Sequence, residues 1–289
     1  SGQGISTLLR AGVAIVTARL LGAEDRGTYA VFFSQVLILA SFLSLGCSQA
    51  TIYGLSRGTS RDHIAAVNLV LVASGTFGVG VLFVMGGGSW FIVGSWYFQL
   101  LLWLATAVIL ADQLGSAHLL GEQRFELYQR NLILQSTAGA LGALPLFWMS
   151  EPSAFAAVSV RVAFEAAVVI FLVTVLAREL KIRRPRFIGS VAKAHMKFGL
   201  RTFAPSLVNT AHYRVHLLVL AGLSGDEAAG IFSVALLFME FVSFGPNAIG
   251  TVLLPKFSAI EDGRVAADSA AMVVRIVLAM GLLIAGVLW

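Results

Sequence analysis

Unbroken apolar runs of about 20 residues, the length that crosses a bilayer as one α-helix, recur along most of the 289-residue chain. Strands of a membrane barrel would instead alternate apolar and polar residues over about 10 positions. Only 12% of the residues are charged and 58% are hydrophobic, whereas about a quarter of a soluble domain is charged. The sequence therefore predicts an all-α polytopic membrane protein.

These runs predict nine membrane-spanning helices in this chain. Their approximate bounds are 6–21, 28–45, 64–85, 98–120, 132–148, 155–176, 203–220, 231–253 and 270–289. The chain starts at Ser1 instead of a methionine and stops at Trp289 within the last apolar run. We therefore expect a fragment that lacks a short N-terminus and a longer C-terminus.

A short polar motif separates the first two spans and returns 203 positions later. Residues 20–29 read LLGAEDRGTY, and residues 224–232 read SGDEAAGIF. The motifs align Gly22 with Gly225, Glu24 with Glu227, and Gly27 with Gly230. Because each motif follows one apolar helix and opens another, we expect two hinges that mark two copies of one helical bundle.

Basic residues mark one side of the predicted bundle. With the N-terminus in the cytoplasm, the outer loops carry only Arg26, and the positive-inside rule selects this orientation. The inner loops carry Arg57, Arg61, Arg124, Arg130, Arg178, Lys181, Arg183, Arg184, Arg186, Lys193, Lys197, Arg201, Lys256 and Arg264. Membrane orientation thus explains the net charge of +5, and no nucleic-acid partner is expected.

One long inner loop divides the chain. We expect an N-terminal lobe of six helices at 1–177, a basic cytoplasmic linker at 178–201, and the first half of a C-terminal lobe at 202–289. In the linker, basic residues repeat every four positions (Lys193, Lys197, Arg201) opposite an apolar stripe (Phe187, Val191, Ala194, Phe198). This pattern predicts an amphipathic helix on the anionic inner leaflet. A solvated linker that only sets the orientation is the alternative.

Ionisable residues inside the spans are functional candidates, because each costs at least about 2.5–3.5 kcal/mol at the bilayer centre. Arg10 lies near the middle of the first span with no acidic neighbour in sequence, so we expect it to face a water-filled cavity. Arg161 and Glu165 share a helix face, where they either neutralise each other or serve the cavity. Asp112 and Glu240 are candidate ion-coupling acids.

The seventh span is the most polar. One helical stripe carries Pro205, Asn209, His212 and His216. Arg214 points to nearly the opposite side, because successive residues turn by about 100°. Folding at the second hinge brings Arg214 and Glu240 to a similar depth, at a rise of about 1.5 Å per residue. We predict that one face lines the cavity and that the other forms an Arg214–Glu240 pair.

Several kinds of chemistry have no motif in this sequence. It contains no GxxxxGK[ST] phosphate loop, no His/Cys cluster at metal-ligand spacing and no GxSxG nucleophile motif. The sequence therefore predicts no cofactor and favours a transporter over an enzyme. With Arg19 set aside as a helix cap, arginines still outnumber acids in the spans, which suits an anionic ligand such as pyrophosphate.

Three short motifs carry a family resemblance. They are residues 18–30 (ARLLGAEDRGTYA), residues 119–125 (LLGEQRF), and KFGL at 197–200 followed by Pro205 and the second hinge. They resemble the polysaccharide repeat-unit flippases, the O-antigen (Wzx-type) transporters of the multidrug/oligosaccharidyl-lipid/polysaccharide exporter superfamily. The resemblance implies a two-lobed bundle of about 12–14 helices, a pseudo-twofold axis along the membrane normal, a central cavity and alternating access.

The resemblance also implies a function. The family moves oligosaccharides linked to undecaprenyl pyrophosphate across the bacterial inner membrane, and it binds their anionic head group with cationic cavity residues. On this chain that role falls to Arg10, with Arg161 and Arg214 as weaker candidates. In this interpretation the path of the sugar is lined by Asn209, His212 and His216.

Two other functions are weighed beside the flippase. One is a cation-coupled multidrug exporter that uses Asp112 or Glu240, and the other is a membrane-embedded polysaccharide polymerase or ligase. The enzyme is disfavoured, because the longest outer loop, 86–97, is short and largely apolar. For the flippase we expect a role in a lipopolysaccharide, capsule or exopolysaccharide pathway. The expected partners are the assembly machinery of that pathway and the anionic lipids of the inner leaflet. The expected location is the inner membrane, with several membrane crossings and a cytoplasmic N-terminus.

Overall fold

The computed structural model describes residues 2–86, 96–149, 152–179, 186–258, 271–275, 277–279 and 281–282. Within these ranges, side chains are described for 4–81, 96–149, 152–178, 186–236 and the short C-terminal turns. The chain forms two units, 1–234 and 235–289, and the candidate site belongs to the first. Every element in the described ranges is helical, which confirms the predicted all-α fold.

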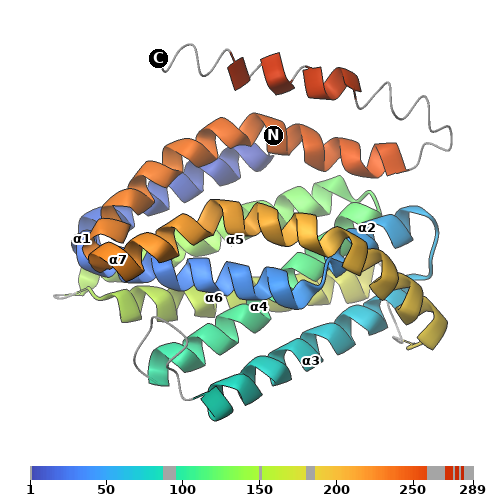
Figure 1. Cartoon of the computed structure of the whole chain (residues 1–289), viewed down its shortest axis with the longest axis horizontal. Coiled ribbons are helices and arrows are strands. Elements are labelled where there is room, and N and C mark those ends of the chain that lie inside the picture. The colour runs from blue at the N-terminus through green and yellow to red at the C-terminus, as the bar shows by residue number, and fades with distance from the viewer. Residues whose placement is uncertain are drawn as a thin grey trace. The chain divides into compact units, whose positions relative to one another are not determined.

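The helices follow one another with short connections (Figure 1). They are α1 Gly2–Ser44, α2 Cys47–Ser56, α3 Arg61–Gly86, α4 Trp96–Gly121, α5 Phe125–Ala143, the 3-10 helix η1 Leu144–Trp148, α6 Ala154–Glu179 and α7 Gly189–Ser258.

Five described stretches are long and apolar enough to cross a membrane: Gly4–Ser44, Arg61–Val81, Trp96–Gly121, Ala154–Arg178 and Gly189–Leu236. The first and the last have 41 and 48 residues, which is enough for two crossings each at about 20 residues per crossing. The predicted ninth span, 270–289, lies largely outside the described residues.

Both long helices bend at a glycine. Gly22 in α1 has φ 71° and ψ −179°, and Gly225 in α7 has φ 83° and ψ 174°. Glycine adopts such positive φ values without the steric penalty that a Cβ brings. The two hinges expected from the repeated motif are therefore present, and their backbone geometry is nearly the same.

The predicted second span, 28–45, ends in the structure at Ser44. Leu45 (φ 47°) and Gly46 (φ 71°) then adopt left-handed backbone before α2, a short helix that no predicted span covers. One predicted span changes conformation within its bounds. The fifth leaves the α-helix at Ala143 and continues as η1, which has Pro145 in its first turn. Proline has no N–H to donate to the carbonyl four residues earlier, so the α-helix cannot continue unchanged.

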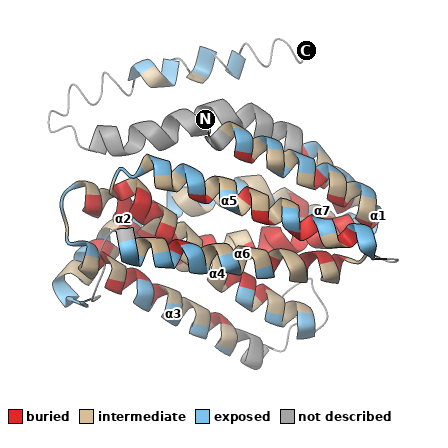
Figure 2. Ribbon diagram, turned by 180° about the vertical axis from the view of Figure 1, so that it is seen from behind, coloured by how far each residue is buried: buried red, intermediate tan, exposed pale blue. Residues whose placement is uncertain are grey.

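The helix α1 is the central element of the first unit. In its most apolar 18-residue stretch, 61% of the residues are buried, whereas only 11% are buried in the corresponding stretch of α6. The second half of α1 contributes Tyr29, Phe32, Phe33 and Val36 to a buried cluster that α4, α6 and η1 complete. Figure 2 shows buried and exposed positions alternating along single helices, as expected when each helix has a packed face and an open face.

The first part of α7 runs antiparallel to the second half of α1 and docks on α2. The rings of Phe42 and Phe203 meet edge to face at 5.6 Å, and Phe198 stacks on Tyr53 at 4.3 Å. Half-buried Phe198 therefore packs on an aromatic ring of α2. The amphipathic helix at the inner leaflet stays a prediction. The three basic residues of the linker stripe, Lys193, Lys197 and Arg201, are exposed.

Candidate functional site

Polar side chains of α1, α4 and α5 meet inside the first unit. We call this group the α5 polar cluster; its members are Ser6, Arg10, Asp112, Ser116, Asn131 and Ser136. Asn131 donates from Nδ2 to Asp112 Oδ1 at 3.2 Å and to Ser116 Oγ at 3.1 Å. Further along α5, Ser136 Oγ lies 2.6 Å from Ser6 Oγ and 3.4 Å from Arg10 Nε, both on α1. The cluster thus ties three helices together through hydrogen bonds between side chains.

The amide of Asn131 leaves one oxygen available. The residue is 3% exposed, and its Oδ1 has no hydrogen-bond partner among the described side chains. Because Nδ2 already donates to two acceptors, the remaining Oδ1 can accept a hydrogen bond or coordinate a small cation. This is the arrangement in which the predicted coupling acid Asp112 lies.

Arg10 lies at the margin of the α5 polar cluster. Its side chain is exposed, and its charge acts on the carboxyl of Asp112 and on the hydroxyl of Tyr128. Arg10 is therefore both accessible and close to a hydrogen-bonding surface. This placement is compatible with the predicted cavity role, which itself stays a prediction.

Arg161 has a different environment. Its Nε donates to Glu165 Oε1 at 2.8 Å, its Nη1 donates to the Tyr29 hydroxyl at 2.6 Å, and its guanidinium carbon lies 3.9 Å from the ring centre of Phe33. Of the two roles left open for this arginine, the structure forms the ion pair with Glu165. A pyrophosphate at Arg161 would have to share the guanidinium with these partners.

The predicted sugar path lies on α7. Asn209 and His212 are exposed, whereas His216 is half-buried. The ring of His216 packs edge to face on Phe232 at 5.3 Å, and its Nδ1 lies 3.1 Å from the carbonyl of His212. The stripe is thus accessible at Asn209 and His212 and is held in place at His216.

The predicted pair on α7 can be tested by charge reversal. Arg214 is half-buried, and the side chain of Glu240 lies outside those described. We expect Arg214→Glu and Glu240→Arg each to lower the amount of folded protein in the membrane, because each places two like charges at one depth. The double reversal should restore it, and quantitative immunoblotting of membranes measures all three. A double mutant no better than the single mutants would contradict the pairing.

A second buried polar group includes His118, near the C-terminal end of α4, and no pattern in the sequence predicts it. Asn68 donates to Thr51 at 2.9 Å and lies 3.4 Å from His118 Nδ1, and Thr51 lies 3.4 Å from His195 Nε2. Four separate helices supply these residues, so no local spacing could have indicated the group. Among the described residues, no three His, Cys, Asp or Glu side chains are grouped to hold a metal ion.

Arg26 also differs from expectation. The sequence predicts it in an outer loop, yet it is 7% exposed, donates from Nη1 to Thr17 at 3.2 Å, and lies 5.2 Å from the ring centre of Tyr29. The α-helix resumes directly after Gly22, so Arg26 falls within α1 and points into the bundle.

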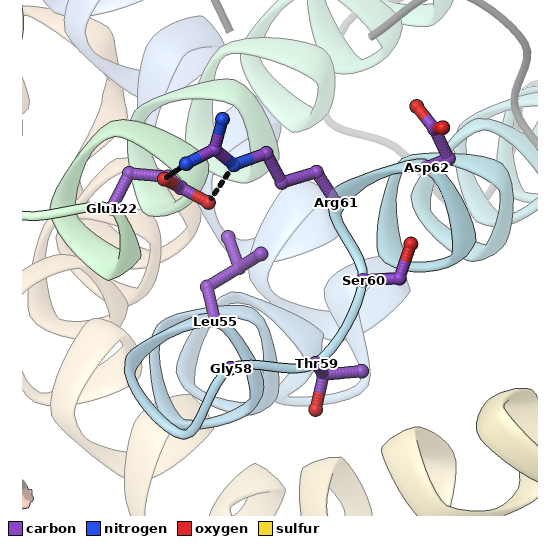
Figure 3. Close-up of a pocket in the computed structure, with 7 residues that line it drawn as sticks. All are labelled: Leu55, Gly58, Thr59, Ser60, Arg61, Asp62 and Glu122. Carbon is purple, nitrogen blue, oxygen red and sulfur yellow. Dashed lines mark hydrogen bonds and ion pairs between the residues drawn. The ribbon is translucent and has the colours of Figure 1, made fainter.

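A surface pocket of about 470 Å³ lies where α2, α3 and α4 meet (Figure 3). It is lined by Leu55, Gly58, Thr59, Ser60, Arg61, Asp62 and Glu122. Arg61 and Glu122 form an ion pair with an N–O distance of 2.6 Å. With Arg61 paired and Asp62 beside it, the lining presents no excess of positive charge, which makes the pocket a poor site for an anionic head group.

The fold is that of a membrane transporter. An outward-facing multidrug resistance MATE transporter of the MOP superfamily superposes with a TM-score of 0.66 at 16% identity over 89% of this chain and 61% of its own. The MATE multidrug transporter DinF-BH superposes with a TM-score of 0.66 at 16% identity, over 89% of this chain and 62% of its own. A third similar structure is a MOP superfamily transporter from Pyrococcus furiosus Vc1 (DSM3638), whose binding pocket is described as having reverse polarity. It superposes with a TM-score of 0.59 at 16% identity, over 89% of this chain and 61% of its own. The chain thus spans less than two thirds of each.

Residues 16–285 match the sequence profile of a family described as polysaccharide biosynthesis protein. The chain belongs to this family, which confirms the resemblance to polysaccharide exporters. No curated protein matches the chain in sequence.

Proposed function

We propose that this protein is a flippase that moves oligosaccharide repeat units linked to undecaprenyl pyrophosphate across the bacterial inner membrane by alternating access. One observation carries the proposal: a chain of a polysaccharide biosynthesis family has the fold of a membrane transporter. A sugar chain on a charged pyrophosphate cannot cross hydrocarbon unaided, because burying an unpaired ion costs many kcal/mol. Such a pathway therefore needs a protein that shields the head group.

Arg10 leads as the pyrophosphate ligand. A guanidinium binds phosphate oxygens with two parallel N–H donors, and the side chain of Arg10 is exposed. Its Nε donates to the buried hydroxyl of Ser136 at 3.4 Å, which helps to orient the guanidinium. Arg161 follows because Glu165 and Tyr29 already occupy its donors, and Arg214 comes third.

The sugar follows the exposed stripe of α7 in this proposal. Asn209 offers an amide, and His212 and His216 offer ring nitrogens, so together they can donate to and accept from sugar hydroxyls. The exposure of Asn209 and His212 supports this assignment.

Asp112 or Glu240 would couple transport to a cation in this scheme. Asp112 is favoured by its neighbour Asn131, whose buried Oδ1 is available as a ligand. The same feature supports a second candidate function, cation-coupled multidrug export; DinF-BH is itself named a multidrug transporter.

The inner membrane, with the N-terminus in the cytoplasm, is the proposed location. The exposed Lys193, Lys197 and Arg201 would then lie at the anionic inner leaflet. O-antigen, capsule or exopolysaccharide assembly machinery is the proposed partner.

Sealed liposomes that contain the purified full-length protein test this function. A pyrophosphate-linked prenyl oligosaccharide is supplied on one leaflet, its appearance on the other leaflet is measured, and export of a cationic dye is followed in parallel. We expect lipid-linked sugar to move without dye export. Dye export that depends on a proton or sodium gradient, without movement of the lipid, would indicate a drug exporter and contradict the flippase.

A further inference from the structure

The two repeated motifs touch each other at Gly27 and Gly230. A Cβ on Gly27 would overlap the carbonyl oxygen of Asp226 and would lie 3.0 Å from the backbone nitrogen of Gly230. A Cβ on Gly230 would overlap the carbonyl oxygen of Ala23 and would lie 3.0 Å from the nitrogen of Gly27. We call these four residues the hinge contact; the bends of α1 and α7 that hold them lie side by side (Figure 1).

The hinge contact obeys the symmetry of the repeated motif. Moving 203 positions along the chain takes Ala23 to Asp226 and Gly27 to Gly230. Each half of the contact is therefore the image of the other half, and a local twofold axis passes between Gly27 and Gly230. The backbones meet without any intervening side chain, which only glycine permits at such separations.

One side-chain interaction breaks this symmetry. Thr28 Oγ1 donates to Asp226 Oδ2 at 2.7 Å. The positions equivalent to Thr28 and Asp226 are Ile231 and Ala23, and these two cannot form the same bond. At this end the two helices thus meet through bare backbone, with the Thr28–Asp226 hydrogen bond beside it.

The other end of the same helix pair is held differently. There Gly46 lies against the carbonyl of Gly199, and aromatic rings interlock on both sides, Phe42 with Phe203 and Tyr53 with Phe198. We call this the pivot contact. Separating it would break ring packing, whereas separating the hinge contact exposes mainly backbone and breaks the Thr28–Asp226 hydrogen bond.

We propose that the hinge contact is a gate between the two sequence copies, which closes the membrane face that holds both hinges and opens about the pivot contact during transport. The proposal rests on alternating access by the flippase described above. Under the predicted topology this is the outer face, so the structure represents a state closed to the outside. Thr28 and Asp226 form the latch of the gate.

Crosslinking tests the gate directly. In a Cys47→Ala background, Thr28→Cys/Asp226→Cys is joined by a short thiol crosslinker. We expect transport of the lipid-linked oligosaccharide to fall at least about 10-fold and to return after reduction. A control pair on the same helices near the pivot, Ser41→Cys/Thr210→Cys, replaces hydroxyls that lie 3.0 Å apart and should crosslink while transport persists. Normal transport by the crosslinked hinge pair would overturn the gate.

A labelling experiment separates the gate from the substrate. The single variant Thr28→Cys is exposed to a membrane-impermeant maleimide, and we expect the rate of labelling to rise when the gate opens, because residue 28 is half-buried in the closed contact. Gly230→Ala should raise this labelling, because its methyl group prevents closure. Gly222→Ala, in the same helix with nothing within 4 Å of the position that its methyl group would take, should leave it unchanged. Equal labelling in the two alanine variants would contradict the gate, even in a protein that moves no lipid.

Discussion

Replacing Arg10 by alanine should lower transport of the lipid-linked oligosaccharide by about 10- to 100-fold, since a hydrogen bond to a charged group contributes about 1.5–3 kcal/mol. The arginine side chain is exposed at the margin of the α5 polar cluster, so its loss should remove a ligand and leave the packing of the bundle unchanged. Arg10→Lys keeps the charge but loses the two parallel N–H donors of the guanidinium. Its transport should lie between that of Arg10→Ala and that of the unmodified protein. Leaflet-to-leaflet transfer in liposomes, normalised to protein amount, measures the effect.

Arg19 supplies the matched control for Arg10. It is an exposed arginine on the same helix near the Gly22 hinge, and Arg19→Ala should retain most of the transport. Normal transport by Arg10→Ala at normal abundance would remove Arg10 from the site and leave Arg161 and Arg214 as the candidates.

Breaking the ion pair between Arg161 and Glu165 should produce the largest loss of stability. Removing one partner of a buried pair costs about 3–5 kcal/mol. We expect about 2–3 kcal/mol for Arg161→Met, because the arginine side chain is 31% exposed and solvent screens part of the interaction. The loss arises because Glu165 and the Tyr29 hydroxyl lose their shared partner. Thermal denaturation in detergent, followed by size-exclusion chromatography, measures it.

Two further variants divide this effect into parts. Arg161→Met/Glu165→Met removes both charges and should recover most of the stability. Tyr29→Phe removes only the hydroxyl and should cost about 0.5–1.5 kcal/mol. If Arg161→Met keeps its thermal stability but loses transport, the arginine serves the substrate, and its role as a structural partner of Glu165 is refuted.

Charge pairing shows why the site is harder to predict than the fold. Arg10, Arg161 and Arg214 look equivalent in sequence, as single arginines within apolar runs. Tyr29 and Phe33 come from a helix that lies far from Arg161 in sequence, so no local spacing could reveal that this arginine is held. The i,i+4 spacing does indicate Glu165 as its partner, because that contact is local.

Local features of the sequence predict the class of membrane protein, the helical architecture and the position of both hinges. These depend on local properties: the length of apolar runs, the missing side chain of Gly22 and Gly225, and the similarity of one motif to another. Three features appeared only in the structure: the short helix α2, the burial of Arg26 and the docking of Phe198 on Tyr53. Tertiary structure also decided that Gly27 and Gly230 meet, because backbone contact between residues 203 positions apart depends on how the helices pack.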